Sequence, residues 1–172
     1  MSSLNKNTFF KSLLFYFPTL LLFISVLNEI DFNYLKIEYF SFNFVYILIF
    51  YWTLKNPHYL SYGSIFLAGL VNDIVTGLPI GISSLCYLLI CAVTAYLRNI
   101  TLTPNFMNDW LSLLFTILLV NSIQVMSLDL IFSIDVNYIR YSINSGFTFI
   151  FYPLFLFLFN NLEKKIKTQK ND

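Results

Sequence analysis

The chain has few charged residues. Only 11% of its 172 residues are Asp, Glu, Lys or Arg, whereas 58% are apolar. A soluble domain usually carries about 25% charged residues, so this composition excludes an ordinary soluble domain. One bilayer crossing needs about 20 apolar residues, and the chain is long enough for about six or seven of them. We therefore expect an integral membrane protein with no room for a separate soluble domain.

The chain is also poor in residues that bind metals or carry out covalent catalysis. It has one histidine and two cysteines, Cys86 and Cys91, which share one apolar run without a CxxC spacing. Such cysteines are best interpreted as small buried hydrophobic residues. We find no Ser/His/Asp set, no phosphate-binding loop and no basic-aromatic pattern typical of nucleic-acid binding. We therefore expect no enzyme activity, no metal, no cofactor and no nucleic-acid partner.

Six apolar segments remain once the short polar stretches are set aside. They predict an all-α membrane protein, a single domain over residues 1–172 that forms a bundle of about six transmembrane helices. The predicted helices span about residues 9–27, 41–54, 59–76, 82–97, 110–132 and 142–162. The segment 41–54 is short for a crossing, and we expect Phe40, Tyr51 and Trp52 to extend it into the membrane interface.

The basic residues are distributed unevenly over the two predicted sides of the membrane. With six crossings, one side holds eight of the ten, which are Lys6, Lys11, Lys55, Arg98, Lys164, Lys165, Lys167 and Lys170. The other side holds only Lys36 and Arg140. Because cytoplasmic loops carry an excess of Lys and Arg, both termini are expected in the cytoplasm. The lysines at the C-terminus could also contact anionic membrane lipids.

The segment from Gly69 to Gly81 departs from the apolar pattern. Gly69, Asp73, Gly77 and Gly81 are spaced four apart, and residues four apart share one face of a helix. Small residues on that face let a neighbouring helix approach closely. A charged Asp at the bilayer centre costs roughly 2.5–3.5 kcal/mol. We therefore expect Asp73 to point into the bundle, just before a helix break at Gly77, Pro79 and Gly81.

Three roles are open for Asp73. Its carboxylate could cap the exposed amides at the start of the next helix, around residues 80–83, which is the role that we favour. It could bind a ligand or a proton directly, or it could contact a partner protein. Asn72, next to it, is a further candidate for a polar contact inside the membrane.

Residues 69–81, with Gly69, Asp73, Gly77, Pro79 and Gly81 at these spacings, resemble the region that identifies the rod shape-determining protein MreD family. The length, the hydropathy and the positively charged ends of the chain are also similar to those of that family. The resemblance implies a fold similar to the S components of energy-coupling-factor vitamin transporters. It also implies a subunit without catalytic activity in the bacterial inner membrane.

The partners that the resemblance implies belong to the cell-elongation (rod) complex, which makes lateral peptidoglycan. The direct partner would be an MreC-type scaffold. The MreB filament, a RodA-type glycosyltransferase and a penicillin-binding transpeptidase would be indirect partners.

Two polar residues interrupt the segment 110–132. Asn121 and Gln124 are three apart, hence on one helix face, and could hydrogen-bond across helices as packing contacts. Alternatively, they could converge with Asn72 and Asp73 in a cavity, as a small-molecule site of an S component requires. Helix 9–27 has few small residues for an energising module to contact, which weakly disfavours this alternative to the scaffold-binding function.

Overall fold

The computed structural model describes residues 16–27, 41–100 and 105–171, with side chains up to Lys164. This part of the chain is all-helical, as predicted. Its six helices are Tyr16–Leu27, α2 (Phe44–Lys55), α3 (Tyr62–Thr76), α4 (Ile82–Ile100), α5 (Phe106–Leu130) and α6 (Tyr138–Asn171).

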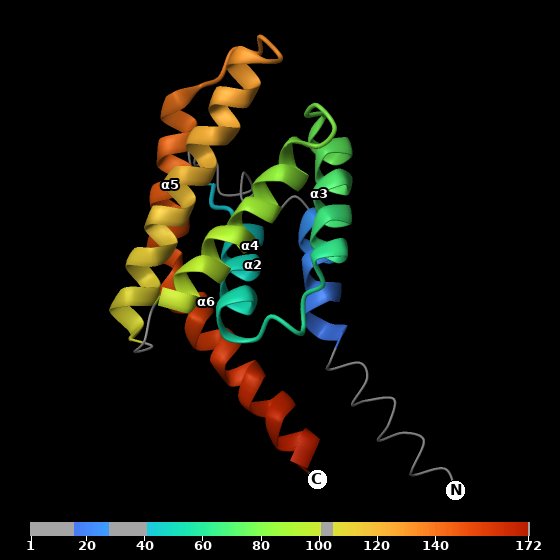
Figure 1. The fold of residues 1–172 in the computed structure, drawn as a ribbon, viewed down its shortest axis with the longest axis vertical. Helices are drawn as coiled ribbons and strands as arrows, with labels where there is room; N and C mark the ends of the chain where they lie inside the picture. The colour runs from blue at the N-terminus through green and yellow to red at the C-terminus, as the bar shows by residue number, and fades with distance from the viewer. Residues whose placement is uncertain (1–15, 28–40, 101–104, 172) are drawn as a thin grey trace, which may run out of the picture.

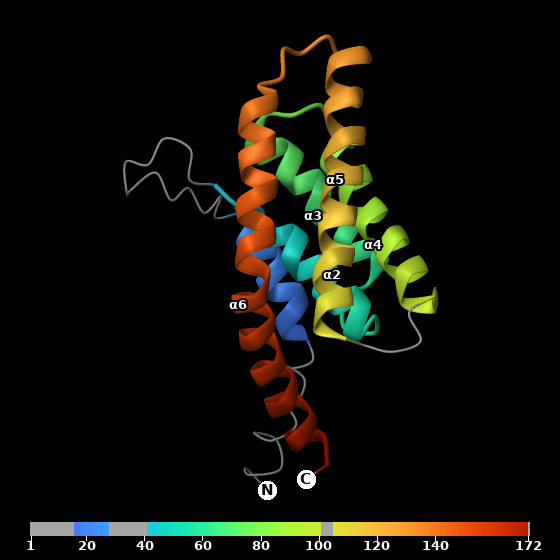
Figure 2. The same cartoon turned by 90° about the vertical axis from the view of Figure 1, so that its left-hand side faces the viewer.

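Successive helices run in alternating directions along the long axis of the bundle (Figure 1). The connection between α2 and α3 lies at the end of the bundle where helix Tyr16–Leu27 begins and α6 ends, whereas the α3–α4 turn and the α5–α6 loop lie at the opposite end. The helices α3 and α4 form one antiparallel pair, and α5 and α6 form another (Figure 2).

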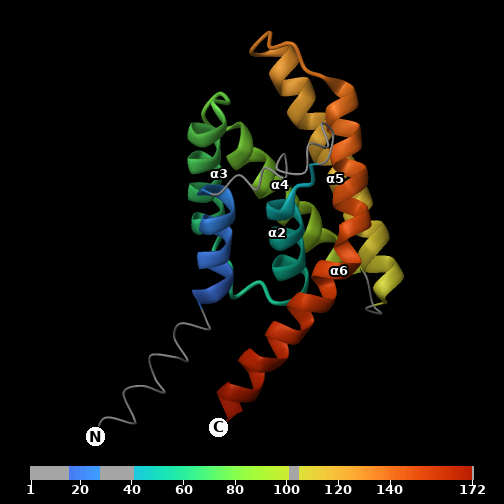
Figure 3. The ribbon, with the colours of Figure 1, turned by 180° about the vertical axis from the view of Figure 1, so that it is seen from behind.

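Helix α2 forms the core between these two pairs (Figure 3). All nine residues from Val45 to Thr53 are buried, because α2 packs against α4, α5 and α6. A helix that is apolar on every face is stable only when it is surrounded by apolar material. Tyr51 and Trp52 are accordingly 0% exposed, so they pack against neighbouring helices, and their predicted position at the membrane interface stays a prediction. Phe40 lies outside the described residues.

Three of the described helices are long and apolar enough to cross a membrane, namely α4, α5 and the part Tyr138–Lys164 of α6. The other three are apolar but shorter. Helix α2, with 12 residues, is about 18 Å long, whereas the hydrocarbon core of a bilayer is about 30 Å thick. Its neighbours bury it, so it needs no full crossing of its own. The number of crossings therefore stays a prediction.

Several helix ends differ from those predicted. Helix α4 continues to Ile100 and α5 begins at Phe106, so the connection between them is shorter than expected. Helix α6 begins at Tyr138, four residues before the predicted start at residue 142. It continues past Pro153 and through residues 163–167, which were predicted to follow the helix as a tail. Glu and Lys are good helix formers, so this charged stretch extends the helix. Residues 9–15 of the first predicted helix lie outside the described residues.

Candidate functional site

The α3–α4 turn begins at a glycine in the left-handed conformation. Gly77 ends α3 with φ 70° and ψ 20°, and its N–H donates to the carbonyl of Asp73. The N–H of Leu78 donates to the same carbonyl at 3.0 Å. Glycine has no Cβ that would clash in this conformation and is therefore the usual residue at such helix ends. The predicted break thus lies where the glycines and Pro79 indicated.

The side chain of Asp73 connects α3 to the start of α4. It is 0% exposed. Its Oδ2 accepts the N–H of Gly81 at 2.7 Å and its Oδ1 accepts the N–H of Ser83 at 2.9 Å. The first N–H groups of a helix have no partner within the helix and carry partial positive charge. The two bonds are those that a capping role requires, and they offset part of the cost of a buried carboxylate.

The helices α3 and α4 are in close contact next to this cap. A Cβ built on Gly69 would lie 2.5 Å from the backbone nitrogen of Ser84, so only glycine fits there. The hydroxyl of Ser84 donates to the carbonyl of Phe66 at 2.9 Å, and the amide of Asn72 donates to the hydroxyl of Ser83 at 2.9 Å. Gly69 and Asp73 thus share the α3 face that packs on α4.

Gly81 and Pro79 complete the turn. Gly81 has φ 104°, and the carbonyl of Pro79 accepts the N–H of Ile82 at 3.3 Å. The residues from Gly69 to Gly81 therefore fix the turn through backbone conformation, close packing and the two carboxylate hydrogen bonds. Whether this turn also contacts a partner stays a prediction.

The polar residues of α5 make hydrogen bonds across helices. The amide of Asn121 donates to the hydroxyl of Ser145 in α6 at 2.7 Å. The hydroxyl of Tyr46 in α2 donates to Oε1 of Gln124 at 3.1 Å. Both contacts are those expected of polar packing residues in a membrane bundle.

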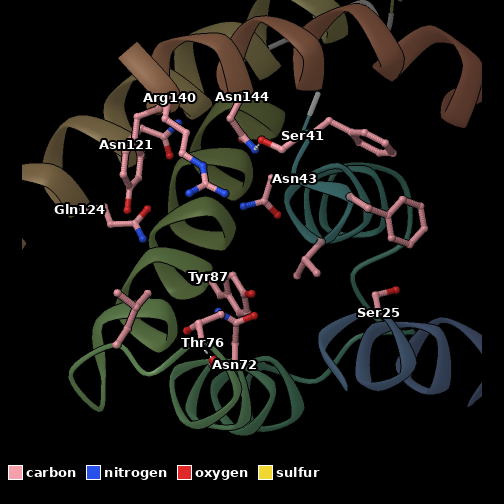
Figure 4. Close-up of a pocket in the computed structure, with 15 residues that line it drawn as sticks. Ser25, Ser41, Asn43, Asn72, Thr76, Tyr87, Asn121, Gln124, Arg140 and Asn144 are labelled. Carbon is pink, nitrogen blue, oxygen red and sulfur yellow. Dashed lines mark hydrogen bonds between the residues drawn. The ribbon is translucent and has the colours of Figure 1, made fainter. Parts of the chain in front are cut away.

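A polar cavity of about 440 Å³ lies between helix Tyr16–Leu27 and the helices α2 to α6. Figure 4 shows that polar side chains from opposite walls face this space. The residues that line it are Ser25, Ser41, Phe42, Asn43, Phe44, Val45, Asn72, Thr76, Leu78, Tyr87, Asn121, Gln124, Arg140, Tyr141 and Asn144. Asn72, Asn121 and Gln124 therefore converge, as the alternative small-molecule interpretation requires. Asp73 is absent from the lining.

Among the described residues of this lining, Arg140 is the charged one, and its guanidinium points into the cavity (Figure 4). Within the described residues, the guanidinium has no ion-pair partner, since the salt bridge found there joins Lys55 and Asp109. The described part of the cavity wall thus carries one positive charge, while its amides can donate and accept hydrogen bonds.

Three residues of the lining, Arg140, Asn43 and Asn144, were not among the predicted site residues. A signal for Arg140 was available, because it is one of only two basic residues on the side predicted to face away from the cytoplasm. Asn43 and Asn144 lie near the N-terminal ends of α2 and α6, where a polar residue is ordinary. Their convergence depends on how the helices pack.

An ion pair lies at the other end of the bundle. Nζ of Lys55, at the end of α2, lies 2.6 Å from Oδ2 of Asp109 in the first turn of α5. The Asp109 side chain is 8% exposed and that of Lys55 is 28% exposed. Nearby, the guanidinium of Arg98 donates to the carbonyl of Thr53 at 3.1 Å. These contacts tie α2 to α4 and α5.

A family model described as rod shape-determining protein MreD matches residues 9–162 of the chain. The match includes the polar turn, the cavity and five of the six helices in full. No curated protein matches the chain. No solved structure matches it either, so the predicted similarity to transporter S components stays a prediction.

Proposed function

The chain belongs to the rod shape-determining protein MreD family, and on this premise we propose that it is a non-enzymatic inner-membrane subunit of the rod complex. The family supports a role in rod shape determination and a location in a membrane. Within that role, we propose that the protein binds an MreC-type scaffold and thereby supports lateral peptidoglycan synthesis. The MreB filament, the RodA-type glycosyltransferase and the penicillin-binding transpeptidase are proposed as indirect partners.

The observation that carries this proposal is the family match over residues 9–162. The match extends far beyond the glycine-rich turn whose spacing resembles that of the family. The proposed orientation places both termini in the cytoplasm. It is supported by the eight basic residues on that side. Helix Tyr16–Leu27 also begins at the end of the bundle where α6 ends (Figure 1).

We further propose the α3–α4 turn as one contact with the scaffold. Ile74 and Ile80 are 70% and 74% exposed, while Asp73 behind them is fully buried and hydrogen-bonded. A rigid turn that presents apolar side chains loses little conformational entropy on binding. An Ile80→Asp variant should therefore recover less scaffold, whereas Ile100→Asp, at the opposite end of α4, should recover a normal amount.

Co-purification from membranes tests the proposal. The tagged protein should recover a single-pass MreC-type scaffold, and the recovery should fall in the Ile80→Asp variant without a change in membrane abundance. Recovery of a vitamin-like small molecule in place of any scaffold would favour the alternative function, an S component of a vitamin transporter, and would contradict the proposed function.

A further inference from the structure

We propose that the polar cavity binds an anionic group, a phosphate or a carboxylate, with the guanidinium of Arg140 as its charged contact. The ligand would enter at the end of the bundle that holds the α3–α4 turn and the α5–α6 loop. The lining residues of α3 lie near its C-terminal end and those of α6 lie near its N-terminal end, and both of these helix ends are on that side. Neither the family role in rod shape nor scaffold binding requires such a ligand.

The charge of the residues that line the cavity favours an anionic ligand. Among the described residues that line the cavity there is no carboxylate, and Arg140 is the cation. In the described part of the chain, the nearby carboxylate of Asp73 is bound to the N–H groups of Gly81 and Ser83. The planar guanidinium can donate two parallel hydrogen bonds to a carboxylate or a phosphate, which is why Arg is common at such sites.

Two amide side chains add donors to the same space. Oδ1 of Asn43 accepts the backbone N–H of Tyr46 at 3.3 Å, and that bond fixes which atom is the oxygen. The NH₂ group of Asn43 is therefore left to face the cavity (Figure 4). Oε1 of Gln124 accepts the hydroxyl of Tyr46 at 3.1 Å, which leaves its NH₂ group available as well. Donors around a cation favour a ligand with several acceptor oxygens.

The cavity is large enough and firmly built. Its volume of about 440 Å³ lies within the range of roughly 300–1,000 Å³ that is usual for small-molecule sites. The amide of Asn144 donates to the hydroxyl of Ser41 at 3.0 Å, and that of Asn121 donates to Ser145 at 2.7 Å. These bonds fix the walls that α5 and α6 form. The side chains there therefore lose little conformational entropy when a ligand binds.

Two sources could supply the anionic group, namely the headgroup of an anionic lipid and a soluble anion. The purified protein is reconstituted into phosphatidylcholine nanodiscs for both arms of the test. In the first arm, a fraction of phosphatidylglycerol is added and bound lipid is measured by native mass spectrometry. In the second, inorganic phosphate and pyrophosphate are titrated and the shift in melting temperature is recorded.

The unmodified protein should bind the anion in at least one arm. Arg140→Gln should weaken that binding about 10- to 100-fold, since it removes charge-assisted hydrogen bonds. Asn43→Asp keeps the acceptor for the N–H of Tyr46, so α2 stays capped, but it replaces a donor with a negative charge and should also weaken binding. Lys164→Gln removes one positive charge at the opposite end of α6 and should leave binding unchanged.

A response to phosphatidylglycerol alone identifies a lipid headgroup, and a response to phosphate or pyrophosphate alone identifies a soluble anion. The proposal is overturned if neither arm shows binding, or if Arg140→Gln and Asn43→Asp bind as the unmodified protein does. The nanodiscs contain no scaffold, so a negative result here leaves the proposed function untouched.

Discussion

The backbone N–H of Ser83 donates a 2.9 Å hydrogen bond to Oδ1 of Asp73, so the first turn of α4 is held by a side chain near the end of α3. The other carboxylate oxygen of Asp73 accepts the N–H of Gly81. One fully buried carboxylate thus fixes the angle between two helices. Buried N–H groups without such a partner would be costly.

Replacing Asp73 with Leu should destabilise the bundle by about 2–5 kcal/mol, because two N–H groups at the start of α4 lose their acceptor. Asp73→Asn keeps one acceptor oxygen and should have an intermediate effect. Equilibrium unfolding in mixed micelles measures both. If the Leu variant is as stable as the unmodified protein, the cap does not hold the turn.

Gly69→Ala should destabilise the protein by about 1–3 kcal/mol, because the new Cβ would overlap the backbone of Ser84 and push α3 away from α4. Gly146→Ala in α6 is the matched control, since a Cβ there meets nothing within 4 Å. In a helix, alanine is favoured over glycine by up to about 1 kcal/mol, so the control should be neutral or stabilising. Equal effects in the two variants would contradict the close contact.

Backbone conformation alone should determine how much substitutions of the turn glycines destabilise the protein. Gly77→Ala and Gly81→Ala both find open space, yet each should cost about 1–2 kcal/mol because φ is positive at both positions. Gly77→Asn should be tolerated better, since asparagine adopts the left-handed conformation more readily. Thermal melting in detergent compares the three variants. Gly77→Ala melting above Gly77→Asn would argue against this account.

The contributions of Lys55 and Asp109 to stability should be coupled, because the two side chains form an ion pair. Lys55→Met leaves the carboxylate of Asp109 buried without its partner and should cost about 1–3 kcal/mol, since Lys55 is partly exposed. The double variant Lys55→Met/Asp109→Leu should recover most of that loss. A double-mutant cycle of unfolding free energies measures the coupling, and strict additivity would show that the two side chains are not coupled.

The sequence predicted the order of the helices and the inward orientation of Asp73. Both follow from local rules, since an apolar run indicates a membrane helix and a charged residue there must turn away from lipid. The spacing of Gly69 and Asp73 likewise predicted a close-packed face. Such features depend on one helix and its neighbour in the chain.

The cavity and the burial of α2 could not be predicted in the same way. Tyr51 and Trp52 suit a membrane interface by residue type, but α4, α5 and α6 enclose α2 and place both residues in the core. The convergence of Asn43, Arg140 and Gln124 depends on the rotation of three helices about their axes. Local sequence does not determine that rotation.

The central claim, a role in rod shape determination through a non-enzymatic membrane subunit, is tested most directly by depletion in the native bacterium. Cell width and length are measured by microscopy while the protein is depleted, with the unmodified protein and the Asp73→Leu variant supplied in turn. The account predicts that depleted cells become round, that the unmodified protein restores rods, and that the variant restores them poorly. Cells that keep a normal rod shape after complete depletion would contradict it.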